Sequence, residues 1–100
     1  MDIQLKKGLL ELMVLASIKY EDSYGYKIIQ DISTIIDISE STLYPILKRL
    51  EKQKLVKTYK TTYNSRIRKY YQINENGLIK LNQSIDEFDE IKKMYTYMKR

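Results

Sequence analysis

The sequence has no cysteine and no histidine, and it contains only one proline and three glycines. Without cysteine it can form no disulfide, no thiolate metal site and no cysteine nucleophile. Without histidine it also lacks the commonest general base and the commonest transition-metal ligand. No constellation of carboxylates or lysines replaces them, so we expect a protein that is not an enzyme and that holds no metal and no cofactor.

Long hydrophobic runs are absent as well. The longest, Leu12–Ala16, has five residues, whereas a membrane-spanning helix needs about 18 or more. The first residues, Met1–Lys7, begin a helical pattern and lack the layout of a signal peptide. We therefore expect a cytoplasmic protein without a membrane partner. Its 100 residues suffice for one compact domain, which often gains stability by pairing with a second copy.

The positive charge is concentrated in one part of the chain. Residues 1–50 hold six Lys/Arg against seven Asp/Glu, whereas residues 51–100 hold twelve against six. Within residues 48–69 there are nine basic residues and a single acid, Glu51. A basic patch of this density suits a polyanion such as DNA, although a solvated surface is the usual meaning of a charge run.

Two amphipathic helices are predicted before residue 36. The helix over residues 3–19 is apolar on nearly every side, so a chain this short can hardly cover it and a partner chain is expected. A second helix, from about Tyr24 to Ile35, turns its isoleucines inward. These are Ile28, Ile29, Ile32 and Ile35.

A third helix, ending near Gln53, follows a tight turn at residues 37–39. Ser39 or Ser41 can cap it, and a start at Thr42 would put Pro45 in its first turn, where proline removes no intrahelical bond. Its buried residues follow the i, i+3, i+4, i+7 spacing and are Leu43, Ile46, Leu47 and Leu50. The second and third helices together predict a helix-turn-helix.

The next segments predict a β-hairpin that would act as a wing. Residues 55–62 and 66–73 are rich in Tyr, Thr, Val and Ile and flank a short loop, Tyr63-Asn64-Ser65. Successive strand side chains alternate between faces, so one of Tyr70 and Tyr71 should pack inward and the other should lie outward.

A final helix should run from Glu75, capped by Asn74, almost to the C-terminus. Its apolar residues recur about every 3.5 positions and form one long stripe, which favours packing against another helix. They are Leu78, Leu81, Ile85, Phe88, Ile91, Tyr95 and Met98. We expect a mainly α protein with a small β-hairpin: a winged helix-turn-helix over residues 1–73 and a dimerisation helix over 74–100, in one compact unit. The homodimer would form through the first and last helices.

Three motifs add a family resemblance that covers nearly the whole chain. The segment Ser41-Thr42-Leu43-Tyr44-Pro45-Ile46-Leu47-Lys48-Arg49-Leu50-Glu51-Lys52 resembles the recognition helix of PadR-family regulators. Tyr24-Gly25-Tyr26 and Arg68-Lys69-Tyr70-Tyr71 are similar to two further family motifs, in the same order and spacing. The length resembles the short subfamily, whose C-terminal part is a single dimerisation helix.

The resemblance implies a homodimeric repressor that binds a pseudo-palindromic operator and in many members is released by a small molecule. Three features depart from the family pattern, and the first is the hairpin turn Tyr63-Asn64-Ser65, which has none of the glycines usual there. Lys54 stands where the family usually has glycine, which costs on the order of 1 kcal/mol if the backbone there is left-handed. Phe88 stands where the last helix often carries a tryptophan that stacks on flat ligands.

The candidate DNA contacts lie on the outer face of the third helix and on the hairpin. They are Thr42, Tyr44, Lys48, Arg49 and Lys52, followed by Arg66, Arg68 and Lys69. Hydroxyl groups donate to phosphate, and lysine reaches phosphate or a guanine edge. The alternatives are capping for Thr42, an ion pair with Glu51 or with acids of the second helix for Arg49, and a basic strand edge that deters strand pairing for the hairpin residues.

Three further interpretations remain open on the sequence alone. Gly25 would let the second helix approach a neighbour closely. A pocket for a small aromatic inducer would lie between subunits, although plain dimer core is the commoner role of such residues. Its candidate lining is Leu9, Met13, Phe88, Met94 and Tyr95. Rival functions are a plasmid-partition or chromatin-like winged-helix DNA binder and a winged-helix protein-interaction module.

Overall fold

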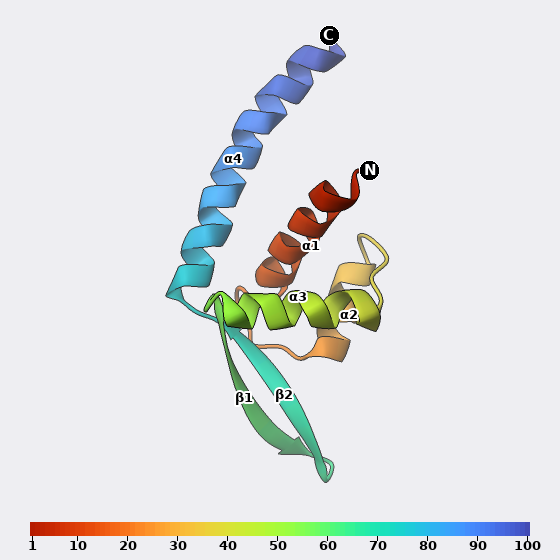
Figure 1. Cartoon of the computed structure of the whole chain (residues 1–100), viewed down its shortest axis with the longest axis vertical. Helices are drawn as coiled ribbons and strands as arrows, with labels where there is room; N and C mark the ends of the chain where they lie inside the picture. Colours follow the sequence, from red (N-terminus) through yellow and green to blue (C-terminus); the bar gives the residue numbers. More distant parts are fainter.

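The computed structural model describes residues 1–100 as four helices and one hairpin. The elements, in chain order, are α1 (Ile3–Ser17), α2 (Gly25–Ser33), α3 (Glu40–Lys52), β1 (Val56–Tyr63), β2 (Arg66–Ile73) and α4 (Glu75–Lys99). Figure 1 shows α1, α2 and α3 clustered together, with the hairpin projecting from one end and α4 from the other. The radius of gyration is 15.0 Å, above the roughly 13 Å of a compact 100-residue domain. The predicted mainly α fold with a small hairpin is confirmed.

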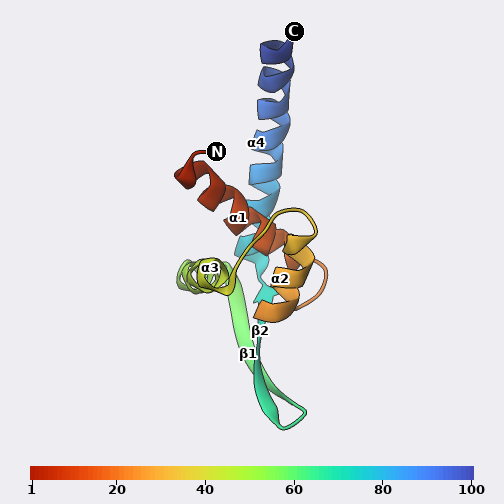
Figure 2. The ribbon, with the colours of Figure 1, turned by 90° about the vertical axis from the view of Figure 1, so that its right-hand side faces the viewer.

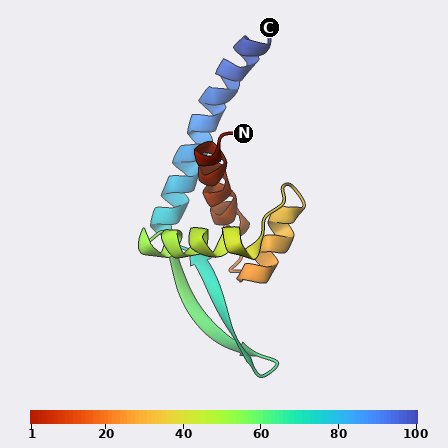
Figure 3. The same cartoon turned by 45° about the vertical axis from the view of Figure 1, so that its right-hand side comes forward.

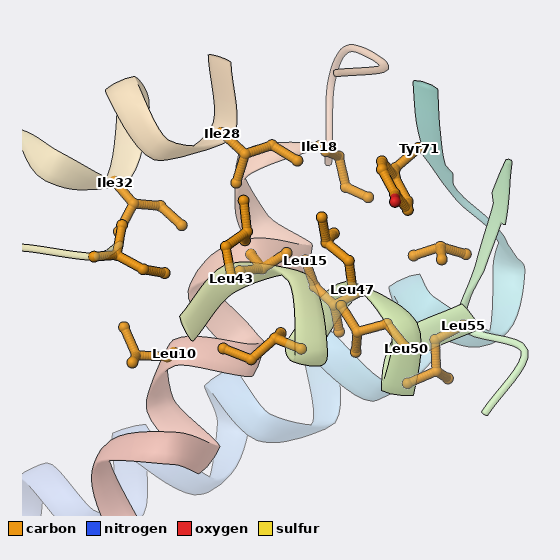
Figure 4. Packing of buried hydrophobic residues seen from close by; sticks show 14 residues of the cluster. Leu10, Leu15, Ile18, Ile28, Ile32, Leu43, Leu47, Leu50, Leu55 and Tyr71 are labelled. Atoms are coloured by element: carbon orange, nitrogen blue, oxygen red, sulfur yellow. The ribbon is translucent and has the colours of Figure 1, made fainter. Parts of the chain in front are cut away.

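The main cluster of the core is built by residues 10–71, and in α4 the buried apolar side chain is Leu81. Fourteen buried side chains form the main cluster, and Figure 4 shows them converging between α1, α2, α3 and the base of the hairpin. The four predicted residues of α3 are all buried, as are Ile28 and Ile32 of α2. Because α3 lies between α1 and the hairpin, its apolar stripe anchors it while its opposite face stays in solvent.

The prediction for Ile35 is wrong, because α2 ends two residues earlier than expected. Thr34 follows its last residue, Ser33, and the Thr34 Oγ1 donates to the Asp31 carbonyl at 2.8 Å. Ile35 lies in the turn beyond and is 77% exposed, while Ile29 is half-buried. The apolar period continues past Ser33 in the sequence but no longer corresponds to a helix face.

The expected place of Pro45 in the first turn of α3 is also wrong. Ser39 is the N-cap, and its Oγ accepts from the Thr42 amide at 3.3 Å. The helix therefore begins at Glu40 and Pro45 lies inside it, in the second turn. Since proline has no N–H, the carbonyl of Ser41 lacks its usual i+4 donor.

The end of α3 is closed by a Schellman motif centred on Lys54. The Leu55 amide donates to the Leu50 carbonyl and the Lys54 amide to the Glu51 carbonyl, both at 3.0 Å. This pattern requires a left-handed residue after the helix, and Lys54 has φ 58°. Leu50 and Leu55 are both buried beside the turn. The left-handed backbone considered for Lys54 is therefore present.

The hairpin is antiparallel and pairs Tyr63 with Arg66, so its turn contains only Asn64 and Ser65. Both turn residues have positive φ, 48° and 63°, as in a type I′ turn. At the base, the Tyr71 amide donates to the Ser23 carbonyl at 2.7 Å, and the Ser23 amide donates to the Tyr71 carbonyl at 3.1 Å. The predicted alternation is confirmed: Tyr71 is buried and Tyr70 is half-exposed.

Helix α4 begins where the chain passes the end of α3. The Asn74 Oδ1 accepts from the Gly77 amide at 2.9 Å, and its Nδ2 donates to the Lys54 carbonyl at 2.7 Å. Gly77 is needed here because a Cβ would collide with the Leu55 carbonyl oxygen. Figure 2 shows that the C-terminal part of α4 extends well past the N-terminal end of α1. None of the four helices combines the length and the hydrophobicity that crossing a membrane requires.

Candidate nucleic-acid interface

Figure 3 shows that the end of helix α3 lies beside the point where the hairpin leaves the bundle. The face of α3 opposite its buried residues is polar. Thr42, Lys48 and Lys52 are exposed on it, and neither lysine takes part in any of the chain's three ion pairs. Thr42 Oγ1 accepts from the capping Ser39 at 3.2 Å. The two lysines are thus free to meet an anion, while Thr42 is part of the helix cap.

Tyr44 belongs to the same face but leans against the start of α2. A Cβ on Gly25 would lie 2.6 Å from the Tyr44 hydroxyl oxygen, so the missing side chain of Gly25 makes room for the phenol ring. The predicted close approach at Gly25 is confirmed. Tyr44 is still 48% exposed.

Arg49 is held by the protein rather than left free. Its Nη1 lies 2.6 Å from Oε1 of Glu11 in α1, whose side chain is largely buried. From the sequence, Glu51 and the acids of α2 were the candidate partners of Arg49, and the partner is instead an acid of α1. The spacing of residues 11 and 49 gives no signal for this pair, since only the packing of α1 on α3 joins them.

Lys69 of the hairpin is likewise paired, with the acid that the basic segment contains. Its Nζ lies 3.2 Å from Oε2 of Glu51, and Thr58 donates to the other oxygen of Glu51 at 3.4 Å. Lys69 also lies directly across from Lys60 in the register of the two strands. Like charges that lie opposite each other destabilise a sheet, so an anion bound beside Lys60 and Lys69 would reduce their repulsion.

One face of the hairpin carries Arg66 and Arg68 together with three tyrosines, Tyr59, Tyr63 and Tyr70. Arg66 lies at the turn, is exposed, and has no ion pair within the chain. Arg68 is enclosed: its guanidinium carbon lies 3.9 Å from the Tyr24 ring centre and 4.2 Å from that of Tyr63. Arg68 Nη1 donates to the Tyr70 hydroxyl at 3.4 Å, and this hydrogen bond raises the pKa of Arg68.

Tyr59 and Asp22 extend this cluster toward the body. The Tyr59 hydroxyl donates to Oδ2 of Asp22 at 2.6 Å, and chiefly this bond raises the pKa of Tyr59 to about 12. The Tyr59 ring stacks on Tyr70 with centres 5.4 Å apart and planes 5° from parallel. Neither Asp22 nor Tyr59 was singled out in the sequence, because only the register of the strands brings residue 59 beside residue 22.

Between the hairpin, α2 and Tyr44 lies an open cleft of about 810 Å³. Its lining combines aromatic rings with the cations Arg66, Arg68 and Lys69. Hydroxyls and cations together suit phosphate oxygens. The structure thus brings Tyr44, Arg66, Arg68 and Lys69 to one cleft, with Lys48 and Lys52 farther along α3.

The candidate ligand residues are only partly brought together. A groove of about 350 Å³ between α1 and α4 is lined by Leu9 and Phe88. Met13 lies elsewhere, packed against the core, and neither Met94 nor Tyr95 lines the groove. Its other apolar lining residues, which the sequence analysis did not name for this role, are Leu5, Leu12 and Ile91.

The architecture and its basic cleft define a winged helix-turn-helix protein of the DNA-binding class. The family model described as "Transcriptional regulator PadR-like family" matches residues 14–83. The chain belongs to this family and is a DNA-binding transcriptional regulator.

The chain is similar to individual proteins over most of its length. An uncharacterized protein of Lysinibacillus sphaericus is 34% identical over 93 residues, which cover 88% of this chain and 85% of that protein. A crystal structure from Streptococcus mutans UA159 is similar with a TM-score of 0.79 and 43% identity, over 86% of this chain and 81% of the other. A PadR family transcription regulator from Clostridium difficile has a TM-score of 0.84 and 27% identity, over 89% and 96%.

Proposed function

We propose that the protein is a cytoplasmic, homodimeric repressor that binds a pseudo-palindromic operator. Each α3 would enter the major groove of one half-site, and each hairpin would lie on the flanking backbone. The half-sites would be about 34 Å apart, one turn of DNA. The observation that carries the proposal is the exposed pair Lys48 and Lys52 on α3, free of acidic partners and on the same helix as Tyr44, which lines the basic cleft.

The second copy is supported by apolar side chains that this chain leaves uncovered. Of the stripe along α4, only Leu81 is fully buried. Ile85, Phe88, Ile91 and Tyr95 are 37–49% exposed, beside the groove that α1 forms with α4. A stripe of this length matches the interface of two packed helices. We propose that α1 and α4 of a second copy cover it.

A dependent proposal concerns release from DNA. The α1–α4 groove, at about 350 Å³, is within the size range of small-molecule sites. A flat apolar ligand beside Phe88, closed in by the second copy, would favour one spacing of the two DNA-binding heads. It acts only by binding the two spacings with different affinity. An anilinonaphthalene dye is a suitable probe: it should bind wild type, bind Phe88→Ala weakly, and lower DNA affinity.

The deciding experiment is fluorescence anisotropy with DNA from upstream of the protein's own gene and a random duplex, at several salt concentrations. We expect a preference of about 10³-fold or more for the upstream DNA, and affinity that falls steeply with salt. Lys48→Ala should weaken binding, whereas Lys93→Ala, a matched exposed lysine on α4, should not. Arg49→Ala should change DNA affinity less than Lys48→Ala, because Arg49 is paired with Glu11.

The rival functions correspond to other outcomes. Cooperative binding to arrayed sites without a palindrome would favour a partition or chromatin-like role. Equal, weak binding to both duplexes, unchanged by Lys48→Ala, would overturn the repressor and favour a protein-interaction module.

A further inference from the structure

Arg68 is the most enclosed cation of the hairpin. Two tyrosine rings lie against its guanidinium, with their centres 3.9 Å and 4.2 Å from the guanidinium carbon, and its Nη1 donates to a third tyrosine, Tyr70. Arg66, two residues earlier on the same face, is exposed and has no ion pair. The two arginines therefore have different surroundings although the sequence places them side by side.

The rings around Arg68 come from two parts of the fold. Tyr63 lies at the end of β1, next to the hairpin turn, whereas Tyr24 is the N-cap of α2 in the body. Tyr70 meets the Tyr24 ring edge-on, with centres 5.5 Å apart. Tyr59, stacked on Tyr70, is bonded to Asp22 of the body. Arg68 thus joins the outer half of the hairpin to residues 22–24.

The hairpin has few main-chain contacts with the rest of the protein, so its orientation depends on side-chain contacts. Its sheet has two strands, and its main-chain bonds to the body are the Ser23–Tyr71 pair at the base. A two-stranded hairpin without further support is marginally stable in water. The contacts of Arg68 with Tyr24 and of Tyr59 with Asp22 add to this main-chain pair.

We propose that Arg68 is a positioning residue that sets the angle of the hairpin to α3, and that it is not a phosphate contact. The inference rests on the proposed DNA-binding function and deepens it. Lysine would not serve, because only a flat guanidinium offers two faces for ring stacking and a fork of donors for a hydroxyl. The backbone contacts of the hairpin then fall to Arg66 and Lys60, which have free charges.

The first test uses the protein without DNA. Nuclear magnetic resonance of the arginine Nε–H groups should show one signal shifted upfield by the two rings, lost in Tyr24→Leu and kept in Tyr24→Phe. Amide hydrogen exchange across the outer hairpin should be faster in Arg68→Lys than in wild type, while Arg66→Lys leaves it unchanged. Equal exchange in the two variants would overturn the positioning role.

The second test is DNA binding as a function of salt. Arg68→Lys keeps the charge, and we expect it to weaken binding about tenfold, as the loss of two ring contacts would, with an unchanged salt slope. Arg100→Lys, the same exchange at the C-terminus of α4 and outside the proposed DNA interface, should stay near wild type, and Arg66→Gln should reduce the slope by about 0.9, the effect of one phosphate. The proposal would be overturned if Arg68→Lys bound DNA with wild-type affinity. It would also be overturned if Arg68→Gln reduced the salt slope as much as Arg66→Gln does.

The two tests separate the inference from the function on which it rests. If wild type binds upstream and random DNA equally, the repressor proposal fails. The exchange comparison of the two lysine variants then decides by itself whether Arg68 holds the hairpin.

Discussion

Lys54→Gly should make the protein more stable. A non-glycine residue in the left-handed region costs about 1–2 kcal/mol, and Lys54 has φ 58° in a turn whose two hydrogen bonds require that backbone. Glycine removes this cost, but its greater conformational freedom in the unfolded chain lowers the stability by about 0.4–1 kcal/mol. The net gain is about 0.5–1 kcal/mol, which corresponds to a rise in Tm of about 2–8 °C for a domain of this size.

The assay is urea unfolding followed by circular dichroism, with all variants at one protein concentration because a dimer's stability depends on it. Lys54→Ala is the matched control: it removes the exposed side chain and its charge but keeps the Cβ, so it should not be stabilised. Asn64→Gly should gain less, since asparagine tolerates the left-handed region. If Lys54→Gly and Lys54→Ala unfold at the same urea concentration, then removing backbone strain at residue 54 does not stabilise the protein.

Three further predictions follow from other contacts. Gly77→Ala should destabilise the fold by about 1–3 kcal/mol in the same urea assay, because the new Cβ meets the Leu55 backbone; unchanged stability would contradict the close approach. The Tyr59 pKa is raised from 10.0 to about 12, so absorbance at 295 nm should show that Tyr59→Phe removes a step near pH 12 and not one near pH 10. Since the folded pKa is the higher one, this stabilisation is complete below pH 10 and is lost as the pH rises toward 12. Ile91→Glu should give monomers in sedimentation equilibrium while Lys93→Glu, on the opposite face of α4, stays dimeric; a dimeric Ile91→Glu would exclude this stripe as the interface.

The regular elements were predictable where the apolar period and the capping residues agree. In α3 the spacing from Leu43 to Leu50 lies between the cap Ser39 and the left-handed Lys54, and all four spaced residues are buried. In α2 the period and the helix end disagree, so Ile35 was assigned to the core although the helix stops at Ser33. The start of α3 at Glu40 instead of Thr42 altered the place of Pro45 in the same way.

The roles of the individual cations were not predictable. Arg49, Arg66, Arg68 and Lys69 look alike as members of one basic segment. In the folded chain Arg49 pairs with Glu11 and Lys69 with Glu51, Arg68 lies between two tyrosines, and Arg66 has no ion pair.

The sequence by itself determined the order of elements, the basic half of the chain and the family, because periodicity, capping and motif spacing are local properties of neighbouring residues. Only the tertiary structure decided which charges are free, since a partner such as Glu11 for Arg49 or Tyr24 for Arg68 lies tens of residues away. Such partners meet only when helices pack and strands pair in register. The energy of a charge depends on the residues around it in space, and the order of residues along the chain does not specify those neighbours.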